Sequence, residues 1–316
     1  MFDATTSIHF LSIAFTAGLP IIGTAMGQAT SARAAIKTLN EQPASRENVS
    51  KIIMISLALT ETAALLATIV AIIVLLGGVH SLPEAIAHLG IACALGIPGF
   101  AIGMAASQPI KNALAAVSRQ PLFAQKIMYL LFLTLSIQQT PIIFGFLISL
   151  IIRNSAATIT TIPEGLGLLA SGLALGLGAL GPALGLARFG GSSCRSIGVN
   201  RHAYNQIFSF SFVSQAMIET PVLFALVVSI LTLFAHPGTL LLNGILCVCA
   251  AIAIGMCTFG LGIGSGKTAA AACLQIAYHP EHYATISRTS IIAQTLIDTN
   301  VIYGLLISFG LIFCIS

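Results

Sequence analysis

The chain repeats one short pattern four times: Leu59-Thr60-Glu61-Thr62, Ile137-Gln138-Gln139-Thr140, Met217-Ile218-Glu219-Thr220 and Leu296-Ile297-Asp298-Thr299. Each stretch lies within apolar sequence that is long enough to cross a bilayer. The third positions of the four stretches, numbered 61, 139, 219 and 298, are almost evenly spaced along the chain. A near-constant period of this kind indicates that one unit is written four times.

The repeated position holds a carboxylate in three copies, at Glu61, Glu219 and Asp298, and an amide in one copy, at Gln139. An ionisable group at mid-membrane depth costs about 2.5–3.5 kcal/mol even on the insertion scale that gives the lowest cost, so its default interpretation is functional. The three acids are therefore the candidate functional residues.

The composition indicates an integral membrane protein. Hydrophobic residues make up 57% of the chain and charged residues 7%, and the mean hydropathy is +1.00, values far from those of soluble domains. The chain has no basic polar face of the kind that binds nucleic acid. Its seven cysteines and seven histidines are scattered without ligand spacing, so we predict no metal site.

Apolar segments separated by short polar loops predict an all-α membrane fold of eight transmembrane helices in four tandem hairpins. We expect loops at Gly77-Gly78 and Pro83-Glu84 after the first hairpin. The expected helices span about 8–39, 49–76, 90–118, 124–152, 165–198, 202–235, 240–278 and 281–315. The corresponding hairpins cover 1–78, 79–153, 154–236 and 237–316.

The basic residues predict the orientation. Twelve of the thirteen lysines and arginines lie in or beside the loops inside hairpins, and Arg153 alone lies near a loop between hairpins. The positive-inside rule then places the four intra-hairpin loops in the cytoplasm and both termini outside.

The first helix of each hairpin differs in kind from the second. The four first helices hold 23 of the 29 glycines, and the second helices hold three. Small residues allow close helix approach in lipid, so the first helices are expected to form a crowded inner ring with the second helices outside. The alternative is ordinary small-residue packing in a single bundle.

These features together resemble the c subunit, or proteolipid, of rotary ATP synthases. That family has a glycine-rich first helix, a polar loop that often reads Arg-Gln-Pro, and a second helix with a central carboxylate. In this chain, the matching loop positions, where stalk contact is implied, are Gln42-Pro43, Arg119-Gln120-Pro121, Asn200-Arg201 and His279-Pro280. The separation from the last residue of each of these four loop motifs to the repeated acid or amide that follows is identical in all four copies. The chain departs from the usual pattern in its four fused hairpins and in Gln139, and both features are known in vacuolar-type proteolipids.

The resemblance implies that Glu61, Glu219 and Asp298 carry the transported ion, H⁺ or Na⁺, with no bound cofactor. It implies a homo-oligomeric ring of this protein in an energy-coupling membrane such as a bacterial plasma membrane. The implied partners are a stator a subunit bearing an arginine, the central-stalk subunits of a soluble ATPase head, and membrane lipids. The protein would be a rotor component without catalytic activity of its own.

Amides and hydroxyls accompany the acids. Gln28 lies on the partner helix of Glu61, while Gln215 and Gln294 precede Glu219 and Asp298 by one helical turn. We predict that these amides support the ion sites together with the threonines that follow the acids, Thr62, Thr220 and Thr299. Such groups serve a proton site or a sodium site, so the ion stays open.

Two other functions compete with the rotor. One is a vacuolar-type ATPase proteolipid used only for pumping. The other is a channel or secondary transporter built from repeats, although transporters usually carry inverted repeats, and here each repeat has two helices, so successive copies share one orientation. Because an amide has no charge to cycle, the Gln139 hairpin is expected to carry no ion, which leaves three carriers per chain.

Overall fold

The computed structural model describes residues 4–315, so the predicted outer limits of the first and last hairpins lie outside the described residues. Eight described helices, counted across their short interruptions, are long and apolar enough to cross a membrane. The first hairpin holds α1 (Ala4–Glu41) and α2 (Arg46–Gly77), and the second holds α3 (Leu82–Ala105), α4 (Ser107–Arg119), α5 (Ala124–Gln138) and α6 (Thr140–Ala156). The third holds α7 (Ile162–Val199) and α8 (Tyr204–Leu233), and the fourth holds α9 (Leu241–Tyr278), α10 (Tyr283–Asp298) and α11 (Val301–Phe313). The all-α membrane fold predicted from the sequence is confirmed.

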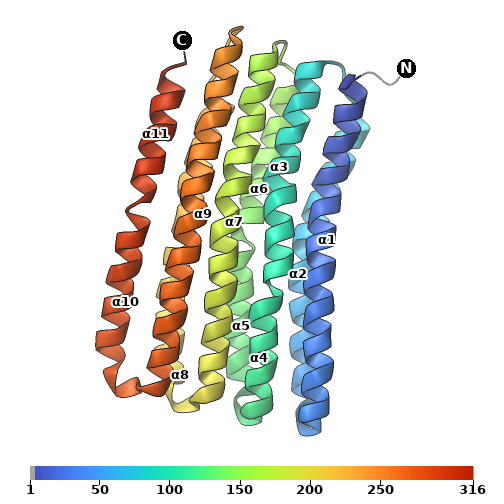
Figure 1. Cartoon of the computed structure of the whole chain (residues 1–316). Coiled ribbons are helices and arrows are strands. Elements are labelled where there is room, and N and C mark those ends of the chain that lie inside the picture. The colour runs from blue at the N-terminus through green and yellow to red at the C-terminus, as the bar shows by residue number, and fades with distance from the viewer. Residues whose placement is uncertain (1–3, 316) are drawn as a thin grey trace.

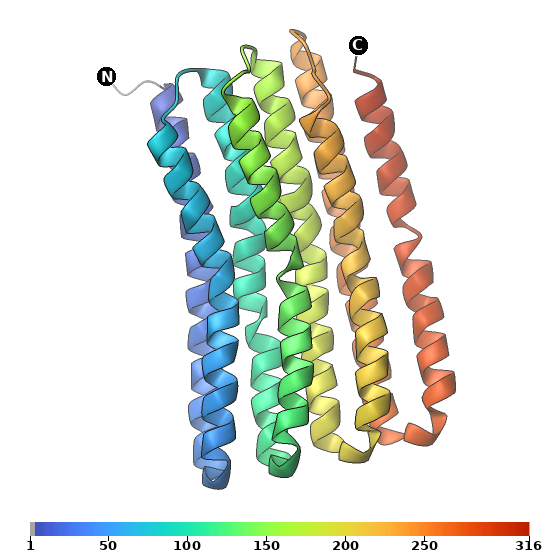
Figure 2. The same ribbon diagram turned by 180° about the vertical axis from the view of Figure 1, so that it is seen from behind.

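The helices stand side by side in two rows (Figures 1 and 2). The inner row consists of α1, α3 with α4, α7, and α9, each packed on the next in that order. The outer row consists of α2, α5 with α6, α8, and α10 with α11. Both termini lie at one end of the molecule and the four turns within hairpins lie at the other (Figure 1).

Glycines bring the inner-row backbones into contact. A methyl group added to Gly27 would overlap the backbone of Gly103, and one added to Gly185 would overlap the backbone of Gly262. Relative to the repeated acid or amide of each hairpin, Gly27 and Gly185 occupy one register position, and Gly103 and Gly262 occupy another. The inner row is thus the crowded row that the glycine distribution predicts.

Three of the predicted helices are interrupted near the level of the repeated acid: at Ala106 between α3 and α4, at Gln139 between α5 and α6, and after Asp298 between α10 and α11. Pro109 and Pro141 have no N–H to donate to the carbonyls of Ala105 and Ile137, and this loosens the helix at the first two interruptions.

The third interruption has side-chain causes. Asn300 Nδ2 donates to the carbonyls of Leu296 and Ile297, and Thr299 Oγ1 donates to the Leu296 carbonyl. These side chains compete with the backbone for its acceptors. By contrast, α2 and α8 run unbroken through Glu61 and Glu219.

The loop predicted at Pro83-Glu84 is wrong, because these residues form the first turn of α3. Ser81 caps that helix and accepts from the Glu84 N–H at 3.3 Å, and proline at a first-turn position has no N–H to leave unpaired.

Candidate functional site

The acid of the first hairpin lies on the surface of the outer row. Glu61 is exposed in the middle of α2. The predicted supporting group Gln28 donates its Nε2 to the Leu57 carbonyl at 3.2 Å, one turn before Glu61, and not to the Glu61 carboxylate. Thr62 donates to the Leu59 carbonyl at 2.8 Å. The first site is therefore an open carboxyl group on an outer helix.

The acid of the third hairpin contacts the second hairpin. Glu219 is half-buried on α8, and its carboxylate interacts with the Thr140 hydroxyl at the start of α6. The predicted supporting residue Gln215 is fully buried one turn earlier, and neither its Nε2 nor its Oε1 has a partner within residues 4–315. Thr220 donates to the Ala216 carbonyl at 3.0 Å. The site thus joins residues of two hairpins.

The acid of the fourth hairpin accepts from its own inner helix. Ser265 Oγ on α9 donates to Asp298 Oδ1 at 2.9 Å. Ser265 is fully buried, and it stands at the same separation before Asp298 as Gln28 does before Glu61. The predicted supporting residue Gln294 instead donates to Ser214 on α8 at 3.2 Å and to Ser290 at 3.1 Å, and Thr299 donates to the Leu296 carbonyl.

The amide of the second hairpin is turned inward. Gln139 is 7% exposed, and among the described residues neither of its amide atoms has a partner. The neighbouring Gln138 is fully buried and donates to the Ala183 carbonyl of α7 at 3.2 Å. The carboxyl of Glu61 and the amide of Gln139 share a register position but not an environment.

The four predicted loop motifs adopt one turn geometry. Gln42, Gln120, Asn200 and His279 have φ between −132° and −141°, and each precedes a short 3₁₀ turn. Prolines 43, 121 and 280 begin three of these turns and Arg201 begins the fourth, while Arg119 ends α4 immediately before its turn. All four turns gather at the end of the molecule opposite the termini (Figure 1).

The sequence did not single out Thr140 and Ser265 as hydroxyl partners of acids, or Ser214 as a partner of Gln294. The register that links Gln28 to Glu61 could have identified Ser265, because Ser265 stands at the same separation before Asp298. No comparable spacing pointed to Thr140, because its contact with Glu219 joins neighbouring hairpins.

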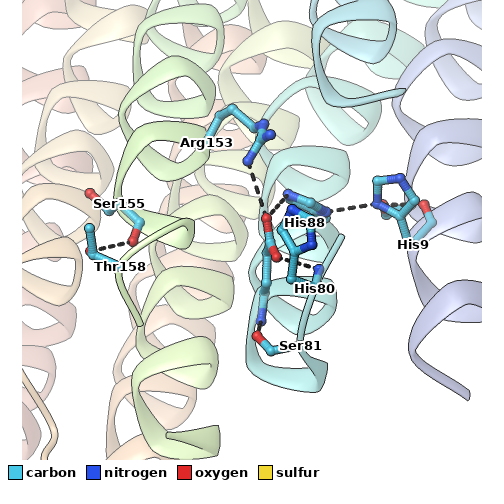
Figure 3. Close-up of polar contacts among 9 residues, drawn as sticks. His9, His80, Ser81, His88, Arg153, Ser155 and Thr158 are labelled. Carbon is cyan, nitrogen blue, oxygen red and sulfur yellow. Dashed lines mark hydrogen bonds and ion pairs between the residues drawn. The ribbon is translucent and has the colours of Figure 1, made fainter. Parts of the chain in front are cut away.

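A second polar cluster joins residues of α1, α3 and α6 (Figure 3). Buried Glu84 forms an ion pair with Arg153 of α6 at 3.3 Å and accepts from the His80 N–H at 2.7 Å. His88, with Nε2 4.0 Å from Glu84, places its Nδ1 2.9 Å from Nδ1 of His9 on α1. We call these five residues the terminal cluster. It ties α1, α3 and α6 together and gives Arg153, the one basic residue near a loop between hairpins, a counter-charge.

Comparison with known proteins identifies the repeated unit. A family model described as the ATP synthase C subunit matches residues 11–74, 169–232 and 248–311. These are parts of the three hairpins that carry acids, and the matches leave out the second hairpin.

The chain is 38% identical over 66 residues to the ATP synthase c subunit of Gloeobacter violaceus, which covers 21% of this chain and 80% of that protein. It is 41% identical over 64 residues to ATP synthase c subunit 2 of Cereibacter sphaeroides, covering 20% of this chain and 77% of that protein. The chloroplastic ATP synthase c subunit of Porphyra purpurea is 35% identical over 66 residues, which cover 21% of this chain and 80% of that protein. One such relative therefore corresponds to about one hairpin. Because the three family matches cover more than half of its residues, the chain belongs to the ATP synthase C-subunit family.

Proposed function

We propose that the chain is the ion-carrying rotor subunit of a rotary ATP synthase, with Glu61, Glu219 and Asp298 as the carriers. As a member of its family it is a membrane rotor proteolipid and not itself an enzyme. Ion movement past a stator would turn the ring and couple to ATP synthesis or hydrolysis in a soluble head.

The observation that carries the proposal is the shared position of the three acids on the outer row. Each lies equally far beyond its loop motif in the sequence, a separation that corresponds to about 27 Å along a helix axis. Glu61 is exposed there, and Glu219 and Asp298 are half-buried. Carboxyl groups at one depth on one row can meet a stationary partner in succession.

The chemistry of a carboxyl group in lipid explains the coupling. An isolated carboxylate is too costly in hydrocarbon, so each carrier crosses the lipid-facing part of a turn neutralised by its ion. Release requires water or a fixed positive charge, which we assign to an arginine of a stator a subunit. The ion then leaves on one side and is replaced from the other, so a gradient gives the rotation a direction.

We assign H⁺ as the carried ion. Asp298 accepts one hydroxyl, from Ser265, and Glu219 interacts with one hydroxyl, from Thr140. The amide nearest Glu61 is directed to the Leu57 carbonyl. A single hydroxyl is enough to form a hydrogen bond with a carboxylic acid, whereas a hard metal cation such as Na⁺ prefers several oxygen ligands at once. Sodium ions are therefore expected to leave carboxyl reactivity unchanged.

We further propose that several copies close into a ring, because the two edges of the chain are complementary. Gly181 and Gly185 of α7 are covered by Phe259 and Gly262 of α9. Their repeat counterparts on α9 are Gly260 and Gly264. Among the described residues, a methyl group added to Gly260 would have nothing within 4 Å, and one added to Gly264 would meet only Ile297 of its own hairpin.

The positions on α1 that would cover these two glycines are Ile22 and Ala25, both exposed. The same contact repeated between α9 of one copy and α1 of the next is heterologous and closes a ring if the rotation allows it. The turn ends of all hairpins would then face the central-stalk subunits together.

Labelling with a hydrophobic carbodiimide tests the carrier assignment, because the reagent attacks protonated carboxyl groups in apolar surroundings. We expect Glu61, Glu219 and Asp298 to be modified and proton transport to stop. The matched control is Glu164, which sits in the first turn of α7 and accepts from the Thr160 and Thr161 N–H groups. Modification confined to Glu84 or Glu164 would refute the assignment, and protection by sodium ions would replace H⁺ with Na⁺.

A further inference from the structure

The inner row carries a basic groove on the face turned away from the outer row. The groove has a volume of about 290 Å³. Its polar lining consists of Gln108 and Asn112 from α4, Arg188, Ser192 and Arg195 from α7, and Lys267 from α9. All of its lining residues belong to these three inner helices, so the groove belongs to the inner face of one chain.

The three cations of the groove lack a counter-charge in the part of the chain that the structure describes. Within residues 4–315, none of Arg188, Arg195 and Lys267 takes part in an ion pair. The sequences of α4 and α9 contain no Asp or Glu, and the single acid of α7 is Glu164 at its opposite end. The charge of the groove is therefore left for a ligand to balance.

The depth of the groove makes that balance important. Leu186 and Ser265 occupy the register position of Gln28, on the inner helices at the level of the repeated acids. Arg188 and Lys267 each lie two residues beyond that position, which is about 3 Å along the helix axis. Arg195 lies about 10 Å further toward the turn end. Ionised side chains at membrane depth are costly unless they are paired or hydrated.

The surface on either side of the groove changes from apolar to basic along the helices. On the side away from the turns, Arg188 and Gln108 border a second depression of about 250 Å³ whose other lining residues are Leu184, Gly185 and Ile263. On the side of the turns, Arg195 and Arg119 border a third of about 170 Å³. A ligand with an anionic end and an apolar body fits this order.

We propose that the groove binds the phosphate group of an anionic phospholipid. The guanidinium groups of Arg188 and Arg195 and the ammonium group of Lys267 would hold the phosphate, since arginine forks match phosphate oxygens and lysine adds a point charge. Gln108 and Asn112 would donate to the remaining headgroup oxygens. The acyl chains would run over Leu184 and Ile263, away from the turn end.

This binding site is separate from the proposed ion carriers and lies within one chain. Its occupancy depends neither on ring closure nor on ion transport, so the two proposals fail separately. In a closed ring, the lipid would occupy the central space with its headgroup near the depth of the carriers.

Binding measurements on the purified full-length chain in detergent test the proposal. The probes are phosphatidylglycerol, phosphatidylcholine and inorganic phosphate, and the bound species are counted by native mass spectrometry. We expect R188Q/K267Q to bind phosphatidylglycerol about 30-fold more weakly than wild type, which corresponds to about 2 kcal/mol for two cations. The control R33Q/R46Q removes two exposed charges outside the groove and should bind as wild type does.

Equal binding of phosphatidylglycerol and phosphatidylcholine would overturn the proposal, as would equal losses in the two double variants. Displacement of the lipid by millimolar inorganic phosphate, with no preference among acyl lipids, would assign the groove to a free phosphate anion instead.

Photo-cross-linking of the wild-type chain gives a second test that needs no variant. A phosphatidylglycerol with a photoreactive group near the glycerol should cross-link to peptides of α4, α7 and α9 around the groove. Cross-links confined to the outer row would refute the inner-face site.

Discussion

The ion pair between Glu84 of α3 and Arg153 of α6 makes a quantitative prediction about how the two sides of the second hairpin are held together (Figure 3). The Glu84 side chain is 4% exposed and that of Arg153 18% exposed, so this is a buried pair. Removing one partner of a buried pair costs about 3–5 kcal/mol, because it leaves the other charge buried and uncompensated. Glu84 keeps the His80 N–H as a donor, so we place Arg153→Gln at the lower end, about 3 kcal/mol.

The cost should appear as easier separation of α3 from its neighbours. Cys93 of α3, half-buried and five residues beyond His88, reports on that region, and fully buried Cys273 of α9 reports on a distant one. At a fixed low concentration of sodium dodecyl sulfate, we expect Arg153→Gln to speed thiol labelling of Cys93 about 150-fold, the factor that corresponds to about 3 kcal/mol. Labelling of Cys273 should change much less.

Two controls decide whether the ion pair is the cause. Glu164→Gln changes the repeat counterpart of Glu84, which caps α7 without an arginine, and should have an effect under about 1 kcal/mol. Adding Glu84→Gln to Arg153→Gln removes the stranded charge and should recover part of the loss. An unchanged Cys93 labelling rate in Arg153→Gln, or losses that simply add in the double variant, would refute the reasoning.

Three further predictions concern the carriers and the ring. Ser265→Ala should speed carbodiimide labelling of Asp298 about tenfold and leave the labelling rate of Glu61 unchanged, because the Ser265 hydroxyl stabilises the unreactive carboxylate form of Asp298. Equal labelling rates of Asp298 in wild type and variant would contradict the contact. Gly260→Leu should leave the chain folded in detergent but prevent ring assembly, because Gly260 has open space within the chain. Gly262→Leu should instead destabilise the chain itself, because the new side chain would overlap Gly181 and Pro182. Sedimentation measures the loss of assembly, and helicity measures the loss of stability. Gln139→Glu should raise the number of ions moved per nucleotide by at most a third, and by less if the new carboxyl stays as buried as the amide. The threshold gradient for net ATP synthesis measures this ratio.

The sequence predicted the elements that depend on composition and period. Apolar length located eight spans, and the glycine distribution separated the inner row from the outer row, because close backbone approach requires small residues wherever it occurs. The constant separation between loop motif and acid predicts that the three carboxyl groups lie at one depth. These features repeat four times, and repetition makes them visible in a single sequence.

The features that the sequence did not predict are those in which the repeats differ. The amides of Gln28 and Gln294 are directed to Leu57 and Ser214, because a flexible amide takes whichever partner packing brings within reach. Gln139 is buried and lies at the interruption before Pro141, and apolar length reveals neither feature. Glu84 was assigned to a loop because proline and a nearby glycine pair indicate turns, and its ion-pair partner lies far away in the sequence, at the end of the next outer helix.

The second hairpin shows why loss of an acid need not mean loss of a role. Its register position holds an amide that is turned inward, and the family matches leave this hairpin out. Yet the next residue, Thr140, supplies the hydroxyl that interacts with Glu219 of the third hairpin. In a ring of identical single hairpins, a change at the acid position would alter every site at once. In this fused chain, the second hairpin can give up its carboxyl group while its neighbouring hydroxyl continues to serve the next carrier, so selection can act on each site separately.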